Sequence, residues 1–316
     1  MGDNIRVLVA TNTFPSEARP GDTPSIKDQV DDLMRLGVSV EILYIDSRRK
    51  INYLVGALKL FSLSFTPKKY DLIHAFYGHT GVLAKLQKKY PVIVTFLGSD
   101  LLGKKDSRIG RLAARMADGV IVMTEEMKKA STRQDARVIP FGANAAIFKP
   151  YSAPQARSEL GLAQGKKLVL FPWDPARPVK RYQLAQEAVA TLRAAYDVEL
   201  LTIHNKAREI IAKYMSACDA MILTSSHEGS PLAVREALAC HLPVVSVDVG
   251  DVRTIVESAG GGYIASEKAS DLAEKISRVF EQPGAFFKDS SKVHNSGDSA
   301  RDVLSFYKQI IMAKKR

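Results

Sequence analysis

Two glutamates eight positions apart, Glu228 and Glu236, have the types and spacing best suited to chemistry in this chain. Glu228 lies in the turn HEGSP, which follows the apolar run DAMILTSS (219–226), and Glu236 lies on the helical pattern after the turn. Ser230 suits the N-cap of that helix and Pro231 its first position. The sequence therefore predicts a strand, a turn and a helix whose N-terminus lies at the carboxyl end of the strand.

A helix N-terminus in this place suits a phosphate, because the N–H groups of its first turn lack intrahelical partners and it is the positive end of the dipole. Glu236 lies nearly two turns further, where a carboxylate can accept hydrogen bonds from ribose hydroxyls. Glu228 can reach a hydroxylated group beyond a diphosphate. The pair predicts a site that brackets a nucleotide sugar. The alternative is that Glu228 is a surface turn residue and Glu236 a solvated helix residue paired with Lys or Arg.

The elements around this turn predict two similar α/β domains. Apolar runs without polar alternation are typical of strands buried on both faces of a parallel sheet, and they occur in two sets: 5–11, 38–45, 70–77, 91–98, 119–124 and 136–142, then 167–173, 198–204, 219–226, 242–250 and 261–266. The segment FKPYSAPQARSELGLAQGKK between the sets favours a linker with a short helix. Two doubly wound, Rossmann-like domains meeting near residue 150 would leave a cleft facing the carboxyl ends of both sheets, where such folds bind ligands.

Length and composition agree with this organisation and limit the class of protein. The 316 residues, 46% of them hydrophobic, fit two globular domains of about 150 residues each. Cys218 and Cys240 have neither disulfide nor metal-ligand spacing, so we expect two small buried hydrophobic side chains in a reducing compartment. The N-terminus resembles neither a signal peptide nor a myristoylation site, and no apolar run approaches the ~18 residues of a membrane span. We expect a cytoplasmic protein.

The net charge of +11 is concentrated in the first half of the chain. Residues 1–150 hold 23 basic and 15 acidic residues, against 22 and 19 in residues 151–316. Either this is ordinary solubilising charge, or it forms a basic face for an anionic lipid or an acidic substrate. Nucleic acid is not expected as a partner, because the basic residues are not interleaved with aromatic residues in a known motif.

The run KYMSACDAMILTSSHEGSPLAVREALACHLPVVSVDVGDV (213–252) resembles the Glu-x7-Glu motif of retaining glycosyltransferases of family 4. That family has the GT-B fold, in which two Rossmann-like domains face a central cleft and the second holds the nucleotide sugar. The likeness extends over residues 5–282 and is strongest over 167–265. It implies that Glu236 binds the ribose and that Glu228 contacts the donor sugar. The donor site would also include the turn and the first helical amides, at Gly229, Ser230, Pro231, Leu232 and Ala233.

A second stretch, FPWDPARPVKRYQLAQEAV (171–189), lies where the family places an Arg and a Lys on the donor diphosphate. Lys180 matches the family's Lys. The family's Arg lies in a Gly-Arg pair where this chain reads WDP, so the resemblance assigns that role to the nearby Arg177. Two cations there would neutralise the charge that develops as the sugar bond breaks; the alternative is a solvated turn.

The first domain resembles the family more faintly and departs from it at a turn. Many relatives have a His in a HGSD-like turn that contacts the donor sugar, whereas this chain has FLGSD, with Leu97 in that position. Asp100, His79 and His74 are the nearby candidates for a polar contact, and Asp100 joins Glu228, Lys180 and Arg177 as a candidate catalytic residue. Phe141 is a second departure, in place of Asn. On the acceptor side we expect Gly21, Gly78, His79, Ser99 and Asp100.

The segment SRRKINYLVGALKLFSLSFTPKKY (47–70) bears on the acceptor. Ile51, Leu54, Val55, Leu58 and Phe61 fall at helical spacing among basic residues, of which Arg48, Arg49, Lys50 and Lys59 are the membrane candidates. The pattern fits an interfacial helix on an anionic leaflet. It also fits an ordinary helix buried on the sheet with charged ends.

Together these features predict a retaining glycosyltransferase that moves a sugar from a UDP- or GDP-linked donor to a hydroxyl of a glycan or lipid-linked acceptor, without a metal or other cofactor. Its domains would be an acceptor-side domain (1–150), a donor domain (151–297) and a last helix (298–316) that packs back on the first domain. We expect it in the cytoplasm. If an anionic membrane surface is one of its partners, it would be bound peripherally to the inner face of the plasma membrane. The alternatives are a sugar-nucleotide epimerase on the same fold and a non-catalytic nucleotide-sugar binder.

Overall fold

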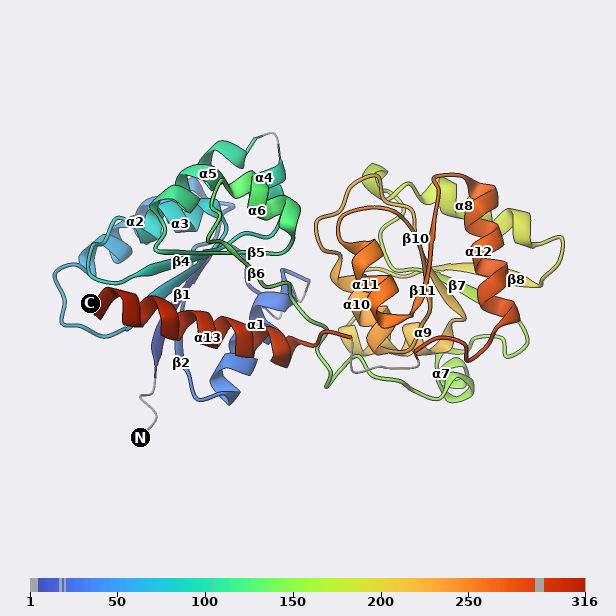
Figure 1. Cartoon of the computed structure of the whole chain (residues 1–316). Helices are drawn as coiled ribbons and strands as arrows, with labels where there is room; N and C mark the ends of the chain where they lie inside the picture. Colours follow the sequence, from blue (N-terminus) through green and yellow to red (C-terminus); the bar gives the residue numbers. More distant parts are fainter. Residues whose placement is uncertain (1–4, 17–18, 20, 104, 288–292, 316) are drawn as a thin grey trace. The chain divides into compact units, whose positions relative to one another are not determined.

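The computed structural model describes residues 5–16, 19, 21–103, 105–287 and 293–315. The chain divides into two compact units, shown in Figure 1. Unit 1 comprises Met1–Phe141 and Ser296–Arg316, and unit 2 comprises Gly142–Asn295.

Unit 1 is built on a six-stranded sheet in the order β2-β1-β3-β4-β5-β6. All neighbouring strands are parallel. The strands are β1 (Arg6–Thr11), β2 (Ser39–Tyr44), β3 (Leu72–Phe76), β4 (Val92–Thr95), β5 (Gly119–Val122) and β6 (Arg137–Val138). Strands β3, β4 and β5 are buried along their whole length, as their unbroken apolar sequences predict.

Helices cover both faces of this sheet (Figure 1). One side carries α2 (Lys50–Ser62), α3 (Gly78–Ala84) and α5 (Ser107–Met116), with the short α4 (Ser99–Leu102) and α6 (Glu125–Ser131). The other side carries α1 (Pro24–Arg35) and the C-terminal α13 (Ser296–Lys315), which pack against each other. The last residues of the chain therefore belong to the core of unit 1, where Val303 and Tyr307 are fully buried.

Unit 2 is built on a five-stranded parallel sheet in the order β11-β10-β9-β7-β8. Its strands are β7 (Lys167–Phe171), β8 (Val198–Thr202), β9 (Ala220–Leu223), β10 (Val244–Val247) and β11 (Gly262–Ala265). Its helices are α7 (Ala153–Leu160), the 3₁₀ turn η1 (Pro178–Lys180), α8 (Tyr182–Leu192), α9 (Arg208–Ala217), α10 (Leu232–Ala239), α11 (Val252–Ala259) and α12 (Ala269–Glu281). Strand and helix alternate along the unit, as in a doubly wound fold.

The predicted fold class, two parallel-sheet α/β units, is confirmed. The prediction that every apolar run is buried on both faces is wrong at the sheet edges. Strand β2 is an edge strand, and its Ile42 and Tyr44 are exposed by 38% and 39%. An apolar run identifies a strand but does not tell whether a second neighbour or a helix covers it. Cys218 and Cys240 are free and buried, as expected, and burial raises the pKa of the Cys240 thiol to about 12.

Candidate functional site

The candidate site of unit 2 lies where the strand order reverses, between β7 and β9. At such a switch point the loops after the two strands diverge and leave a crevice at the carboxyl ends. Three hydrogen bonds join the two loops here. The Thr224 hydroxyl donates to the Lys180 carbonyl over 2.8 Å, the Ser226 N–H donates to the Val179 carbonyl over 2.9 Å, and Arg181 Nε donates to the Thr224 carbonyl over 2.6 Å. The side chains of Thr224 and Arg181, together with one backbone hydrogen bond, thus hold together the two loops that carry Lys180 and Glu228.

Lys180 and Glu228 form a buried ion pair at this switch point. Lys180 Nζ donates to Glu228 Oε1 over 2.5 Å, and the two side chains are only 6% and 15% exposed. The ammonium group also lies 4.5 Å from the centroid of the Trp173 ring, a cation–π distance. Burial lowers the pKa of Lys180, and the charge of Glu228 opposes that effect. The structure therefore brings together the two residues that the sequence placed at a donor sugar and its diphosphate.

Glu236 lies on α10 and is paired with an arginine of the preceding helix. Glu236 Oε1 is 3.5 Å from Arg208 Nη2, and the two side chains are 12% and 19% exposed. The Arg208 guanidinium in turn lies 5.3 Å from the ring centroid of Phe148. The alternative predicted a solvated glutamate paired with Lys or Arg. It is wrong about solvation, because the Glu236 side chain is largely buried, but Glu236 is paired with an arginine as it predicted.

The turn between these glutamates differs from the prediction in its cap. Helix α10 begins at Leu232, its N-cap residue is Pro231, and no side chain caps it. The expected capping by Ser230 is wrong, because the Ser230 hydroxyl donates instead to Asp251 Oδ2 over 2.8 Å. Leu232 and Ala233 are in the first turn of α10, where N–H groups have no intrahelical acceptor. These groups stay available to a ligand at the carboxyl edge.

A second buried ion pair holds this turn in place. Arg235 Nη2 donates to Asp251 Oδ2 over 2.9 Å, and the side chains are 8% and 18% exposed. The Asp251 N–H donates to the Gly229 carbonyl over 3.3 Å. Gly250 has φ of +58°, and a Cβ there would lie 2.3 Å from the same carbonyl oxygen, so only glycine fits. The loop after β10 thus supports the turn that carries Glu228 and Gly229.

Arg177 lies at the start of η1 with an exposed side chain. Its charge is close enough to Lys180 to add to the lowering of the Lys180 pKa. Its side chain makes no hydrogen bond or ion pair with the described residues. Arg177 therefore lies near Lys180, and no hydrogen bond or ion pair with the described residues fixes its side chain.

On unit 1, the candidate acceptor-side residues lie at the carboxyl ends of the adjacent strands β1, β3 and β4. Gly21 is in the exposed loop after β1, and Ser99 is exposed at the start of α4. Asp100 is buried and accepts hydrogen bonds from the N–H groups of Gly98 over 3.0 Å and Leu97 over 3.1 Å. Burial raises the pKa of Asp100 to about 6, although these N–H groups favour the charged form.

Gly78 and His79 open helix α3 directly after a strained residue. Tyr77 has φ of 72°, which is rare for a residue with a side chain. A Cβ on Gly78 would lie 2.8 Å from the Gly110 Cα, so this glycine permits the close packing of α3 on α5. The His79 ring lies 6.0 Å from the Tyr53 ring and is partly exposed.

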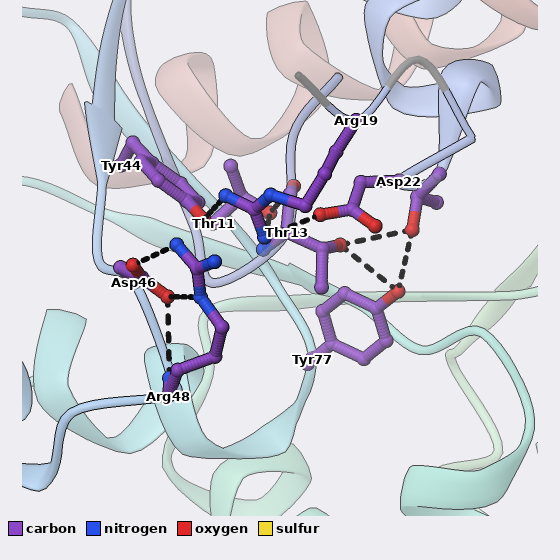
Figure 2. A network of polar contacts seen from close by, with 9 residues as sticks. Thr11, Thr13, Arg19, Asp22, Tyr44, Asp46, Arg48 and Tyr77 are labelled. Atoms are coloured by element: carbon purple, nitrogen blue, oxygen red, sulfur yellow. Dashed lines mark hydrogen bonds and ion pairs between the residues drawn. The ribbon is translucent and has the colours of Figure 1, made fainter. Parts of the chain in front are cut away.

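A network of hydroxyl groups ties the loop after β1 to this strained turn (Figure 2). The Tyr77 hydroxyl is 3.2 Å from the hydroxyls of Thr13 and Thr23, which are 2.9 Å from each other. Beside it, Arg19 binds Asp22 over 2.8 Å. The loop that contains Gly21 is therefore anchored to the end of β3, and the Tyr77 pKa is raised by burial.

His74 is not available to a ligand, and its candidacy as a polar contact is wrong. It is fully buried on β3, with its ring nitrogens 2.6 Å from the Tyr307 hydroxyl and 2.6 Å from the Thr95 hydroxyl. Burial lowers the pKa of His74 to about 3. The residue links the sheet to α13, which the strand sequence alone could not indicate.

Sequence reasoning did not single out several residues that shape the two edges: Trp173, Arg208, Arg235, Asp251 and Tyr77. One usable signal was position, because Trp173, Asp251 and Tyr77 directly follow or lie near the ends of predicted strands. The pairing of Arg235 with Asp251 joins an α10 residue to the loop after another strand, and no spacing rule reports such a contact.

The described residues contain no group of three or more His, Cys, Asp or Glu side chains arranged to hold a metal ion. In the same part of the chain, no helix combines the length and apolarity that crossing a bilayer requires.

Comparison with known families finds one match, to the model of glycosyl transferases group 1, over residues 198–301. The match includes Glu228, Glu236, Arg208, Arg235 and Asp251.

Among curated proteins, the chain is 28% identical to an uncharacterized glycosyltransferase of Methanocaldococcus jannaschii, over 72% of this chain and 70% of that protein. It is 23% identical to a putative teichuronic acid biosynthesis glycosyltransferase of Bacillus subtilis, over 87% of this chain and 89% of that protein. Among solved structures, it resembles an Anabaena protein in complex with UDP-glucose, with a TM-score of 0.64, 17% identity and coverage of 98% and 99% of the two chains.

Proposed function

We propose, for a chain that belongs to the group 1 glycosyltransferases and has the GT-B fold, that it transfers a sugar from a UDP- or GDP-linked donor to a hydroxyl of a glycan or lipid-linked acceptor, with retention of anomeric configuration. The observation that carries the proposal is the Lys180–Glu228 pair at the switch point of unit 2. In this proposal the transferred group is a hexosyl group, and unit 2 binds the donor.

The Lys180–Glu228 pair supports donor binding because a nucleotide sugar offers each of the two side chains a new binding partner. The donor diphosphate attracts the Lys180 ammonium, and a sugar hydroxyl donates to the Glu228 carboxylate. An unpaired buried charge is costly, so binding that supplies both new partners avoids leaving either side chain unsatisfied. The cation–π contact with Trp173 keeps Lys180 at the crevice during the exchange.

The nucleotide end of the donor would lie along α10. The N–H groups of Leu232 and Ala233 suit the diphosphate, and Glu236 suits the ribose hydroxyls. Arg208 lies beside Glu236 and holds this side chain at α10. Gly229, Ser230 and Pro231 complete the turn around the phosphates.

The chain's part in the reaction is orientation and charge stabilisation. Lys180 and Arg177 would stabilise the negative charge that grows on the leaving diphosphate. The acceptor hydroxyl attacks from the face that the diphosphate leaves, and a phosphate oxygen takes its proton. Lys180 and the α10 N-terminus supply the positive charge in this scheme, so we propose that transfer needs no metal; undiminished transfer in the presence of EDTA is the expected result.

The acceptor class draws on the comparisons. The Bacillus subtilis relative is named for teichuronic acid biosynthesis, and the Anabaena structure contains UDP-glucose. By analogy we propose that this enzyme uses a nucleotide sugar in building a surface polysaccharide or glycolipid. It would do so in the cytoplasm, at the inner face of the plasma membrane.

The test is calorimetric titration of the protein with UDP, GDP and their common sugar conjugates. We expect selective binding of one nucleotide, weakened by Lys180→Ala and by Glu236→Ala. The matched controls are Lys268→Ala and Glu257→Ala, which change exposed residues of unit 2 and should bind as the natural protein does. No binding of any nucleotide would refute the proposal.

Turnover separates the proposal from its alternatives. Release of nucleotide only when a hydroxyl acceptor is present supports transfer, and an NMR coupling constant of the product reports retention. Turnover of the donor without any acceptor would instead identify an epimerase or hydrolase. Binding without turnover would identify a non-catalytic nucleotide-sugar binder. The loss of activity would then agree with Leu97 in place of the family's His.

A further inference from the structure

Helix α2 in unit 1 exposes apolar side chains where a globular protein ordinarily exposes polar ones. Its outer face consists of Ile51, Leu54, Val55, Leu58 and Phe61, which are 44–60% exposed. Phe65, just beyond the helix, is 76% exposed, and its ring lies edge-on to that of Phe61 at 5.3 Å. The sequence alternative of an ordinary buried helix is therefore wrong for these five residues.

The inner face of α2 is apolar as well, and it is the side that packs on unit 1. Leu60 and Gly56 are buried, and a Cβ on Gly56 would lie 2.6 Å from Ile45 Cδ1, so the glycine permits a close approach to the sheet. An apolar helix face is ordinarily covered by other parts of a globular protein. Only one side of α2 is covered by the described residues of unit 1.

Basic residues surround the outer face. Between residues 47 and 70 the chain has six Lys and Arg residues and no Asp or Glu. Arg48 is bound by Asp46 and Lys69 by Glu41. No described residue forms a hydrogen bond or ion pair with the side chains of the other four: Arg49, Lys50, Lys59 and Lys68.

The same character continues onto the neighbouring helices. Helix α3 packs between α2 and α5, and all three lie on one side of the sheet (Figure 1). Leu86, which follows α3, and Leu112 and Met116 of α5 are 41%, 48% and 37% exposed. Lys88 and Arg115 are exposed among them. Exposed apolar and basic residues thus occur on α2, directly after α3 and on α5, all on this side of unit 1.

We propose that the outer face of α2 is a docking surface for a bilayer that contains anionic lipid. The apolar side chains would enter the boundary between headgroups and acyl chains, and the basic rim would contact lipid phosphates. A second copy of this chain fits less well, because it would bring the same positive charges together. The inference rests on the proposed function, since a lipid-linked acceptor is presented at a membrane surface.

The test is co-sedimentation of the full-length protein with vesicles of phosphatidylcholine alone and of phosphatidylcholine mixed with phosphatidylglycerol. We expect binding to the mixed vesicles that weakens as salt is raised. Since each Lys or Arg near an anionic surface contributes about a fivefold factor in binding, K50Q/K59Q/K68Q should weaken binding on the order of 100-fold. Leu54→Ser combined with Leu58→Ser should weaken binding to the same vesicles at every salt concentration.

Matched controls change the same kinds of residue elsewhere. R193Q/K206Q/K268Q removes three exposed charges from unit 2, and Met312→Ser removes an apolar side chain that is 65% exposed on α13. Both should bind vesicles as the natural protein does. Equal losses in the control and α2 variants, or no binding to anionic vesicles, would overturn the proposal, as would α2-dependent dimerisation without vesicle binding.

Donor titration in solution is run on every variant. A protein that binds donor but not vesicles refutes the docking surface alone, and one that binds vesicles but no nucleotide refutes the proposed function.

Discussion

The two units share one architecture but bury different kinds of polar group. At the carboxyl edge of unit 2, buried charges stand in opposed pairs: Lys180–Glu228, Arg208–Glu236 and Arg235–Asp251. In unit 1 the buried groups are largely neutral, as in the contacts of His74 with Thr95 and Tyr307 and the hydroxyl network of Thr13, Thr23 and Tyr77. An ion pair can exchange a partner when a charged ligand arrives, whereas a neutral network mainly fixes geometry. The difference supports the proposal that unit 2 binds the charged donor.

The largest effect expected from this comparison is at the Lys180–Glu228 pair. Lys180→Met leaves Glu228 buried without its cation, which should lower the free energy of unfolding by about 3–5 kcal/mol. It also removes a positive charge from the leaving diphosphate, so kcat/KM should fall on the order of 100- to 1000-fold. Urea unfolding and initial rates measure the two effects on one preparation.

The double variant Lys180→Met/Glu228→Leu separates stability from function. Replacing both members of a buried pair by apolar residues is often neutral or stabilising, so unfolding should return to the natural value while activity stays lost. If activity returns along with stability, the pair is structural and the contrast between the two units disappears.

In unit 1, the comparison predicts a pH dependence that comes from a buried neutral histidine. The pKa of His74 is lowered to about 3 in the folded protein, so between pH 6.5 and 3 the unfolded chain binds a proton that the folded chain does not. Stability contributed by His74 is present above pH 6.5 and is lost as the pH falls, by about 2 kcal/mol between pH 7 and 5. His74→Gln, which keeps a donor and an acceptor but does not titrate, should remove this part of the slope in urea unfolding. An unchanged slope would show that His74 is not held neutral.

Asp100 is one of the buried carboxyls of unit 1, and among the described residues it accepts hydrogen bonds from backbone N–H groups and from no cation. Its pKa is raised from 3.8 to about 6, so between these values the folded protein binds more protons than the unfolded chain and stability falls as the pH rises. This change is also about 2 kcal/mol between pH 4 and 7, opposite in sign to that of His74.

The two opposing changes nearly cancel in the natural protein, so single variants should reveal them. Asp100→Asn should leave the His74 contribution uncovered, and stability should then rise with pH between 4 and 6. His74→Gln should leave the Asp100 contribution uncovered, and stability should fall over the same interval. The same direction of slope in both variants would contradict the pKa assignments.

The same comparison shows which features of the two units could be predicted from the sequence. The runs of apolar residues predicted the strands and the fold class, because burial on both faces of a parallel sheet leaves a direct trace in composition. The turn with Glu228 was found because its residues are adjacent in sequence. The pairing of Glu236 with Arg208 and of His74 with Tyr307 was not found, because these contacts join elements whose relative position depends on tertiary packing. Exposure of the α2 face was also beyond the sequence, since helical spacing gives the stripe but not what covers it.

The smallest effect expected concerns the support of the donor turn, where a buried pair acts through the backbone. Asp251 binds Arg235 and the Ser230 hydroxyl, and its N–H holds the Gly229 carbonyl. Asp251→Asn keeps an acceptor for Ser230 but removes the charge opposite Arg235, so the turn should loosen without losing a group that touches the donor. We expect kcat/KM to fall about tenfold, a change of about 1.4 kcal/mol in transition-state binding.

The control for this change is Asp248→Asn, three residues before Asp251 in the sequence. It removes an exposed carboxylate that is paired with Arg253, and kcat/KM should stay unchanged. The rates are compared per folded molecule, because a loosened turn misplaces Glu228 in the reacting complex and lowers the kcat of folded enzyme, whereas general destabilisation lowers only the amount of folded enzyme. If the loss in Asp251→Asn follows only the fraction of folded protein, the Arg235–Asp251 pair stabilises unit 2 and does not position the donor turn. In that case only the Lys180–Glu228 and Arg208–Glu236 pairs would remain as charges held ready for a ligand, and the difference between the two units would rest on the groups that themselves contact the donor.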